Sequence, residues 1–413
     1  MYSLIRRTVL PVLAGLASLA QATPLSFTSA LDLAERLSPK LAANAAAIDV
    51  ARSVAIPAGA LPDPKVFAGI DNFPVSGPDA GRLQADFMTM QKIGVMQEVP
   101  NADKRRAREA VAAASVDVAS ALRRVDRLTV RRDAALAWLD LYYQQRKQAL
   151  FAELDHENSL LAQIVQAQIT SGRAQAADAV APKQEAAQLA DRRDDLSRDL
   201  AQASAKLRQF VGSGADDGLV GDPPAFEVDA SRLRGYLHQH PDLLAFAATT
   251  RKAVAEVTEA QSMKKSDWGV ELAYQRRAPQ FGNMVSIQFT FDLPVSPATR
   301  QDPLIAAKQR ELERIDAERD GMVRDHTAEL ESLLAEYATL ARQLERAEQT
   351  SLPLVEQKVL LQTASYQAGK SDLSALLTAR RERVDQRLRI VELEAGRARA
   401  AARLHYAYGE DKP

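Results

Sequence analysis

Residues 286–294, SIQFTFDLP, alternate between polar and apolar side chains and end in a proline. One face of this stretch and its preceding residue carries only apolar side chains: Val285, Ile287, Phe289, Phe291 and Leu293. Alternation with a period of two is typical of a strand that is buried on one face. Residues 267–277 alternate in the same way. Together they predict a pair of strands near 267–277 and 284–293.

The first half of the chain repeats this pattern. KIGVMQEVP at 92–100 aligns with SIQFTFDLP, and other matches follow the same order in both halves. They pair SPKL (38–41) with HPDL (240–243), DPKVFAGID (63–71) with SDWGVELAY (266–274), and SGR (171–173) with AGK (368–370). The spacing of roughly 200 residues is too long for a solenoid repeat. We therefore predict two structural repeats, 23–222 and 223–413, with first-repeat strands near 64–73 and 86–98.

Very long helices follow the strands. No proline or glycine occurs between Ala102 and Thr170, which as one helix would reach about 100 Å. In the matching segment 330–344, apolar residues recur at alternating spacings of three and four, a pattern that requires a neighbouring helix. The chain returns after Gly172 and Gly369, so we expect each half to end in an antiparallel helical hairpin. The fold class is thus mainly α with a small β part.

Each half also opens with a shorter helix, predicted over 28–56 and 230–261. The return helices are expected over 175–210 and 372–405. Pro182 and Pro353 should kink or break the helices that contain them.

The first 22 residues have the pattern of a cleavable secretory signal. Arg6 and Arg7 precede the apolar run 9–19, and Ala20-Gln21-Ala22 supplies a small-residue cleavage site, so cleavage is expected after Ala22. After Thr23 no apolar stretch is long enough for a spanning helix. The sequence predicts export across an inner membrane.

Composition excludes several classes of protein. The chain has 413 residues with 53 Lys+Arg against 54 Asp+Glu, so no bulk basic charge indicates a nucleic-acid partner. It has no cysteine, which excludes thiol nucleophiles, disulfides and a lipid on an N-terminal cysteine. Retention in a membrane would then depend on the strands, and the protein is expected not to be lipidated.

Four strands in an exported chain need partners if they enter a bilayer. β-Structure survives in lipid only as a closed barrel, and four strands are too few to close one. Three copies would supply twelve strands and would also gather their long helices into a second, helical barrel. The side chains on one face of the last strand would face lipid, namely Val285, Ile287, Phe289 and Phe291. Ser286 and Gln288 on its other face would line a wet lumen. A homotrimeric tunnel is the resulting prediction.

The chain resembles the TolC-like outer-membrane factors of Gram-negative efflux systems. The features that carry the resemblance are the duplicated strand and helix halves, the helix starts SPKLAAN and HPDLLAF, the turn QEVPNADKRR at 97–106 and the two glycine tips. Within that family, LPDPKVFAGIDNFP at 61–74 is most similar to the heavy-metal branch of CzcC and CusC type. The resemblance covers essentially the whole mature chain.

The resemblance implies a location and partners. It implies a homotrimer in the cell outer membrane, in contact with outer-membrane lipid, with a long periplasmic helical extension. That extension would dock a periplasmic adaptor (membrane fusion) protein and an inner-membrane RND pump. The function it implies is export of substrates, heavy-metal cations first, through a tripartite system. The alternatives are a drug or protein conduit of the same family and a soluble periplasmic coiled-coil scaffold.

The resemblance also points to site residues at the hairpin tips. Gly172 with Arg173, and Gly369 with Lys370, are the expected adaptor-docking positions. Family members narrow the periplasmic opening with carboxylates shortly after the tip glycine, and Asp178 matches that place in the first repeat. The second repeat has Ala375 at the equivalent spacing, with Asp372 as the nearest acid, so the candidate aperture residues are Asp178 and Asp372, which depart from the usual double ring of carboxylates.

No catalytic constellation emerges from the sequence. The five histidines form no H-E-x-x-H motif, and G-x-S-x-G and phosphate-loop motifs are absent. His238 and His240 are close enough to share a metal ion on an extended segment. A capping role for His240 before Pro241 is the favoured interpretation, because the same helix start recurs as Ser38-Pro39. We therefore expect no enzyme activity, no cofactor and no metal site.

Overall fold

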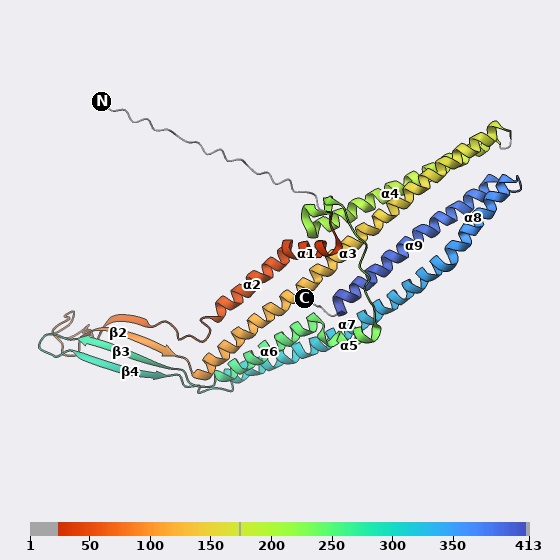
Figure 1. The fold of residues 1–413 in the computed structure, drawn as a ribbon. Coiled ribbons are helices and arrows are strands. Elements are labelled where there is room, and N and C mark those ends of the chain that lie inside the picture. Colours follow the sequence, from red (N-terminus) through yellow and green to blue (C-terminus); the bar gives the residue numbers. More distant parts are fainter. Residues whose placement is uncertain (1–23, 173–174, 410–413) are drawn as a thin grey trace, which may run out of the picture.

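The computed structural model describes residues 24–172 and 175–409. The predicted signal sequence, residues 1–22, lies outside this part of the chain. The molecule is elongated, with a four-stranded sheet at one end and the tips of two helical hairpins at the other (Figure 1). Its mainly helical fold with a small sheet confirms the predicted class.

The two halves contain corresponding elements. The first comprises α1 (Phe27–Leu37), α2 (Pro39–Ala55), β1 (Lys65–Asp71), β2 (Met90–Val99), α3 (Ala102–Thr170), the short 3-10 helix η1 (Ala176–Ala179), α4 (Val180–Val211) and the 3-10 helix η2 (Gly212–Asp217). The second comprises α5 (Ala230–Tyr236), η3 (Leu237–Gln239), α6 (Pro241–Ser262), β3 (Trp268–Arg276), β4 (Met284–Phe291), α7 (Gln301–Arg346), the π-helical turn η4 (Ala347–Ser351), α8 (Leu352–Gln367) and α9 (Leu373–Tyr408).

The four strands form one antiparallel sheet in the order β1-β2-β3-β4. Its central pairing joins the two halves, because β2 of the first pairs with β3 of the second. Val95 lies opposite Val66 on one side and Leu272 on the other, and Leu272 lies opposite Ile287. Apolar positions of all four strands therefore share one face.

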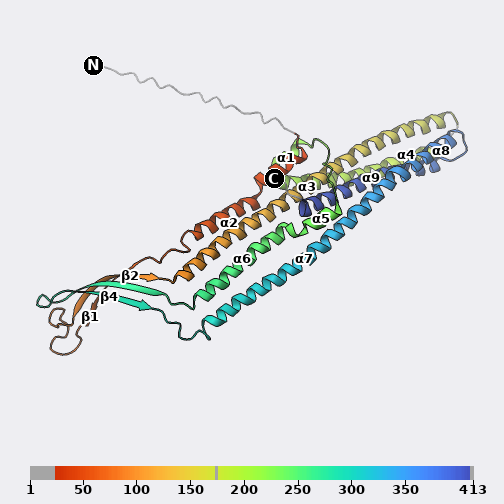
Figure 2. The same ribbon diagram turned by 60° about the horizontal axis from the view of Figure 1, so that its bottom comes forward.

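Next to the sheet, α2, α3, α6 and α7 run side by side as a wall of helices (Figure 2). Toward the tips, α4 packs on α3 and α9 packs on α3, α7 and α8. None of the helices in the described ranges has both the length and the hydropathy needed to cross a bilayer.

The single helices predicted over 28–56 and over 230–261 are wrong in one respect, because each is interrupted in the structure. The first breaks at Ser38, between α1 and α2, and the second breaks at His240, between η3 and α6. Both residues precede a proline, whose ring disfavours helical backbone in the residue before it. Ser38 and His240 instead act as the N-caps of α2 and α6.

The long outgoing helices differ between the halves. α3 runs for 69 residues without a break over the predicted range. The corresponding helix of the second half consists of α7 and α8 with the π-helical turn η4 between them, and Pro353 lies in the first turn of α8. The kink or break expected at Pro353 is thus a π-helical turn just before the proline, and the chain stays helical through it. Pro182 lies in the first turn of α4, where a proline lacks no helical hydrogen bond.

The largest core lies midway along the molecule. Trp138 of α3 is fully buried, and its indole Nε1 donates to the Leu25 carbonyl at 3.2 Å. Phe27 of α1 packs edge-on against the Trp138 ring at 5.3 Å between centroids. Leu207 of α4 completes this contact region. The core thus fixes α1 and α4 on the long helix α3.

Candidate functional site

One face of the sheet is apolar and open to the surroundings. The β4 side chains predicted to face lipid have exposed fractions of 65% for Val285, 63% for Ile287, 58% for Phe289 and 63% for Phe291. The same face continues over the other strands with exposed Val66, Ile93, Val95, Trp268, Leu272 and Tyr274. An exposed apolar area of this extent marks a surface that meets another apolar phase.

The opposite face of the sheet is polar. Lys92 Nζ of β2 lies 2.7 Å from Glu271 Oε1 of β3, and it also lies 4.8 Å from the centre of the Phe67 ring. A side chain at Gly94 would collide with the Phe67 ring, so this glycine lets Phe67 lie flat across β2. The Lys92–Glu271 pair was not predicted, because the sequence does not reveal which residues of β2 and β3 are opposite each other.

Within residues 24–172 and 175–409 of one chain, both edges of the sheet are open, because β1 pairs only with β2 and β4 pairs only with β3. The outer N–H and C=O groups of edge strands are a template for pairing with another chain. Combined with the apolar face, these edges make an isolated subunit incomplete in a bilayer.

The two tip glycines adopt left-handed backbone, with φ of +70° at Gly172 and +68° at Gly369. At the second tip, Gly369 N–H donates to Tyr366 O at 3.0 Å and Lys370 N–H donates to Ser365 O at 2.9 Å. These bonds close the turn after α8 in the manner of a Schellman motif. Arg173 lies outside the described residues, so the proposed Arg173 and Lys370 pair is placed only at Lys370.

The two acids proposed for the periplasmic opening both cap the start of a return helix. Asp178 Oδ2 accepts from the Gln175 N–H at 2.9 Å, and Asp372 Oδ1 accepts from the Ala375 N–H at 2.9 Å. Asp178 is half-buried and Asp372 is exposed. Each acid therefore has a local structural role in addition to its place near a tip.

A groove of about 350 Å³ lies between the two hairpins near their tips. α3 lines it with Leu160 and Ile164, which are 45% and 51% exposed, and α8 lines it with Val359. Tyr366 Oη donates to Gln168 Oε1 at 2.6 Å and so joins the hairpins at its end. This groove was not predicted from the sequence, although apolar residues on two matching helices were the available signal.

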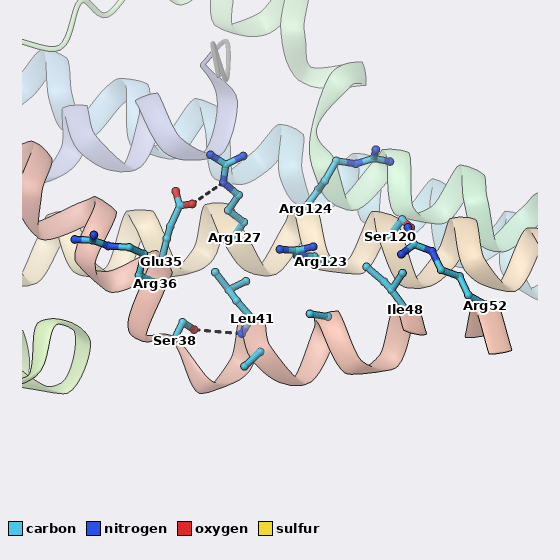
Figure 3. A pocket seen from close by; sticks show the side chains of 12 residues that line it. Glu35, Arg36, Ser38, Leu41, Ile48, Arg52, Ser120, Arg123, Arg124 and Arg127 are labelled. Carbon is cyan, nitrogen blue, oxygen red and sulfur yellow. Dashed lines mark hydrogen bonds and ion pairs between the residues drawn. The ribbon is translucent and has the colours of Figure 1, made fainter. Parts of the chain in front are cut away.

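A second hollow, of about 680 Å³, lies beside α2 and α3 and is lined by arginines (Figure 3). Glu35 accepts from Arg127 Nε at 2.9 Å and also pairs with Arg131. The other arginines around the hollow are Arg36, Arg52, Arg123 and Arg124. The hollow is therefore strongly positive, which the balanced overall charge of the chain conceals.

The histidines are arranged differently from the His238 and His240 pair considered in the sequence. His238 is exposed, whereas His240 caps α6, its Nδ1 accepting from the Asp242 N–H at 3.2 Å. The capping role is thereby confirmed. His240 stacks instead against His326 of α7, with 3.9 Å between ring centroids. This proximity was missed because the two residues are far apart in sequence and each belongs to a different helix.

Solved structures share this fold. A membrane protein from Pseudomonas aeruginosa has a TM-score of 0.79 and 15% identity over 93% of this chain and 90% of its own. The outer membrane protein VceC from Vibrio cholerae gives 0.76 and 18% over 93% and 96%, and the transmembrane channel CusC gives 0.75 and 14% over 93% and 92%. No family model and no curated protein sequence matches the chain. The chain therefore has the fold of outer-membrane channels.

Proposed function

We propose that the chain is one subunit of a homotrimeric outer-membrane channel that exports substrates through a tripartite efflux system. The observation that carries this proposal is the sheet, which has one exposed apolar face, one polar face with the Lys92–Glu271 pair, and two open edges. Three such sheets joined edge to edge make a barrel of twelve strands, an even number within the bacterial range. The apolar face then meets lipid and the polar face lines the lumen.

The helical wall supports the same assembly. α2 and α7 are its outer members (Figure 2), and among the described residues of one chain neither has a helix on its outer flank. Val50 and Val54, one turn apart on α2, are 63% and 62% exposed, and Leu304 at the start of α7 is also exposed. Contact between α2 of one subunit and α7 of the next would bury these residues and close a helical barrel.

A soluble scaffold is the competing function. It requires the strands to pack on the chain's own helices, so that the apolar face is covered. The sheet extends beyond the ends of the helices (Figures 1 and 2). The apolar side chains of β4 on one face of the sheet are more than half exposed. The channel accounts for this exposure and the scaffold does not.

For location and partners, we propose an outer-membrane barrel with a periplasmic helical extension, an adaptor protein at the tips and an inner-membrane RND pump beyond it. The groove lined by Leu160 and Ile164, together with the turns at Gly172 and Gly369, offers apolar and closely approachable surface to adaptor hairpins. The proposed cargo is heavy-metal cations, on the resemblance of residues 61–74 to that branch. Drug and protein cargo are the alternatives.

Matched substitutions on the two faces of β4 test the channel. Phe289→Arg should prevent membrane assembly, because arginine on a lipid-facing barrel position costs about 2–4 kcal/mol near the midplane. Gln288→Arg, one residue away on the polar face, should assemble. The measurement is outer-membrane fractionation with crosslinking, which should trap trimers of wild type and Gln288→Arg. A detergent-free monomer of the wild type with full secondary structure would refute the proposal.

The cargo is tested separately in the native host. Deletion of the gene should lower resistance to heavy-metal salts, and the wild-type gene should restore it while Phe289→Arg should not. Panels of drugs run in parallel distinguish the alternative, because loss of drug resistance alone would assign a drug conduit.

A further inference from the structure

A cluster of titratable side chains lies where the start of α6, the middle of α7 and the end of α9 meet (Figure 1). Asp242 Oδ2 is 3.3 Å from His326 Nε2 and 3.7 Å from His240 Nδ1. One ligand atom from each of the three residues can be chosen so that all lie within 4.8 Å of one another. We propose that this cluster binds one divalent transition-metal ion, with zinc as the reference ion.

The spacing suits a tetrahedral ion. Bonds of about 2.0–2.1 Å to nitrogen and oxygen place neighbouring ligand atoms about 3.3 Å apart. The separations from Asp242 Oδ2 to the two imidazole nitrogens are close to this value, so small side-chain movements complete the site. Two imidazoles and one carboxylate form a ligand set that zinc, cobalt and nickel accept.

The surrounding groups hold His326 in the required orientation. Its Nδ1 lies 3.4 Å from Tyr408 Oη and 3.8 Å from Glu329 Oε2, on the side away from Asp242. In the Nδ1–H tautomer, Tyr408 Oη accepts the Nδ1 proton, the Glu329 carboxylate lies nearby, and Nε2 presents its lone pair to the ion. Metal-binding histidines commonly have such an outer partner, which fixes both the ring and the tautomer.

The charge of the site also favours a cation. Asp242 and Glu329 supply two carboxylates, and Arg132 of α3 is the cation that lines the same cavity. Arg132 Nε is itself bonded to Asp133 Oδ1 at 2.9 Å, which partly offsets its charge. Burial lowers the pKa of His240 to about 4. His240 is thus neutral near pH 7, as a metal ligand must be.

The cavity beside the three residues has a volume of about 170 Å³. Thr129 and Arg132 line its far side, so it is polar and large enough for a water as the fourth ligand. Binding of the ion to His240 Nδ1 breaks one hydrogen bond, because in the metal-free protein this nitrogen accepts from the Asp242 N–H. Pro241 has no N–H of its own, which leaves this helix start with one fewer donor to satisfy.

The site does not depend on the proposed cargo, because it lies among helices of one subunit and joins α6 to α7. The test uses the full-length protein in detergent, stripped with EDTA and titrated with Co²⁺ and then Zn²⁺. The expected result is one Co²⁺ per chain with a visible absorption band, displaced by Zn²⁺, and an unfolding temperature that rises with zinc. Wild-type protein without such a band or shift overturns the proposal.

Matched variants test which residues bind the ion. His240→Asn keeps a side chain that can cap α6 but removes a ligand, and His326→Gln removes another, so both should lose the band. His238→Asn, two residues before His240 on an exposed position, should bind as wild type. Tyr408→Phe should weaken zinc binding about 10- to 100-fold by removing the outer partner. Equal binding by wild type and His326→Gln, or loss of binding in His238→Asn, contradicts the site. Should His326→Gln not fold by circular dichroism, Asp242→Asn takes its place under the same criterion.

Discussion

The two repeats join their first helix to their long helix at corresponding places but with different chemistry. In the first, Lys40 Nζ lies 2.5 Å from Asp126 Oδ1 of α3, and Asn44 donates to the other oxygen at 2.7 Å. In the second, Asp242 aligns with Lys40, and its partner on the long helix α7 is His326, 3.3 Å away. We call these two contacts the first joint (Lys40, Asn44 and Asp126) and the second joint (His240, Asp242 and His326). The first joint contains a lysine that neutralises its carboxylate, whereas the second places its carboxylate and imidazoles beside a cavity.

The difference shows how a duplicated scaffold diverges. Both joints begin with a residue that precedes proline and caps a helix, which fixes the backbone. The residues that pair the short helix with the long helix can differ between the repeats, provided that their polar groups keep partners. The first repeat keeps a permanent ion pair, whereas the second depends on protons or, as we infer, on an ion.

The largest expected effect compares the far ends of the two repeats. Gly369→Leu and Gly172→Leu should each abolish efflux while leaving a folded trimer in the outer membrane, because both glycines have positive φ and a bulky side chain blocks close approach. The measurement is a resistance assay with adaptor crosslinking at the tip. Gly321→Leu is the control, since this helical glycine has open space around it. Wild-type resistance and crosslinking in both tip variants would remove the tips from the mechanism.

The pH dependence of stability separates the two joints next. The pKa of His240 is lowered to about 4, so between about pH 7 and pH 4 the unfolded chain takes up a proton that the folded chain refuses. Stability should therefore fall with falling pH, by about 3 kcal/mol at most for this group. His326, Asp242, Glu329 and Arg132 face the same site and contribute their own charges.

Thermal unfolding in EDTA at several pH values measures this dependence. His240→Asn should flatten the part of the profile between about pH 7 and pH 4, since it removes the group that titrates. A variant profile identical to that of the wild type would show that His240 does not govern the second joint.

Breaking the first joint should lower the stability of the protein by a smaller amount, and this loss should not depend on zinc. Asp126→Ala removes the partner of both Lys40 and Asn44 and should lower the free energy of unfolding by about 1–2 kcal/mol. The loss should be the same with zinc or with EDTA. His326→Gln, by contrast, should differ from wild type mainly when zinc is present. A zinc-dependent loss in Asp126→Ala would contradict the assignment of the two joints.

The smallest effect concerns the cap that both joints share. Ser38 Oγ accepts from the Leu41 N–H at 3.3 Å, so Ser38→Ala should cost about 1 kcal/mol or less. Ser38→Asn retains an acceptor at the N-cap and should restore stability. Unfolding temperatures of the three proteins give the comparison, and an equal loss in Ser38→Asn would show that the hydroxyl does not act as a cap.

Much of the fold could be predicted because its signals are local. The proline-free run after Pro100 specified α3 to the residue, and alternation specified β3 and β4 closely. β2 was predicted less accurately, because Gln91 and Gln97 lie on its apolar face and Met90 and Met96 on its polar face, which blurs the alternation. Local patterns carry this information because helix and strand periods act over a few residues.

The site could be predicted only in part. The apolar face of β4 follows from its own alternation, but the Lys92–Glu271 pair depends on strand register. The His240 and His326 contact depends on how α6 rests on α7, which no short stretch of sequence encodes. Side chains brought together by packing of distant helices become visible only once the packing is known.

Because α3 is long, a small rotation where the first joint holds it causes a large displacement of its tip. Between Asp126, where the first joint holds it, and Thr170 at the tip lie about 44 residues, or roughly 66 Å of helix. A rotation of about 5° at the joint would carry the tip through roughly 6 Å, about one helical turn. His326 lies on α7, so an ion bound between α6 and α7 would act in the same way on the second long helix. In the proposed trimer, small changes at these two contacts would therefore change the width of the opening at the tips.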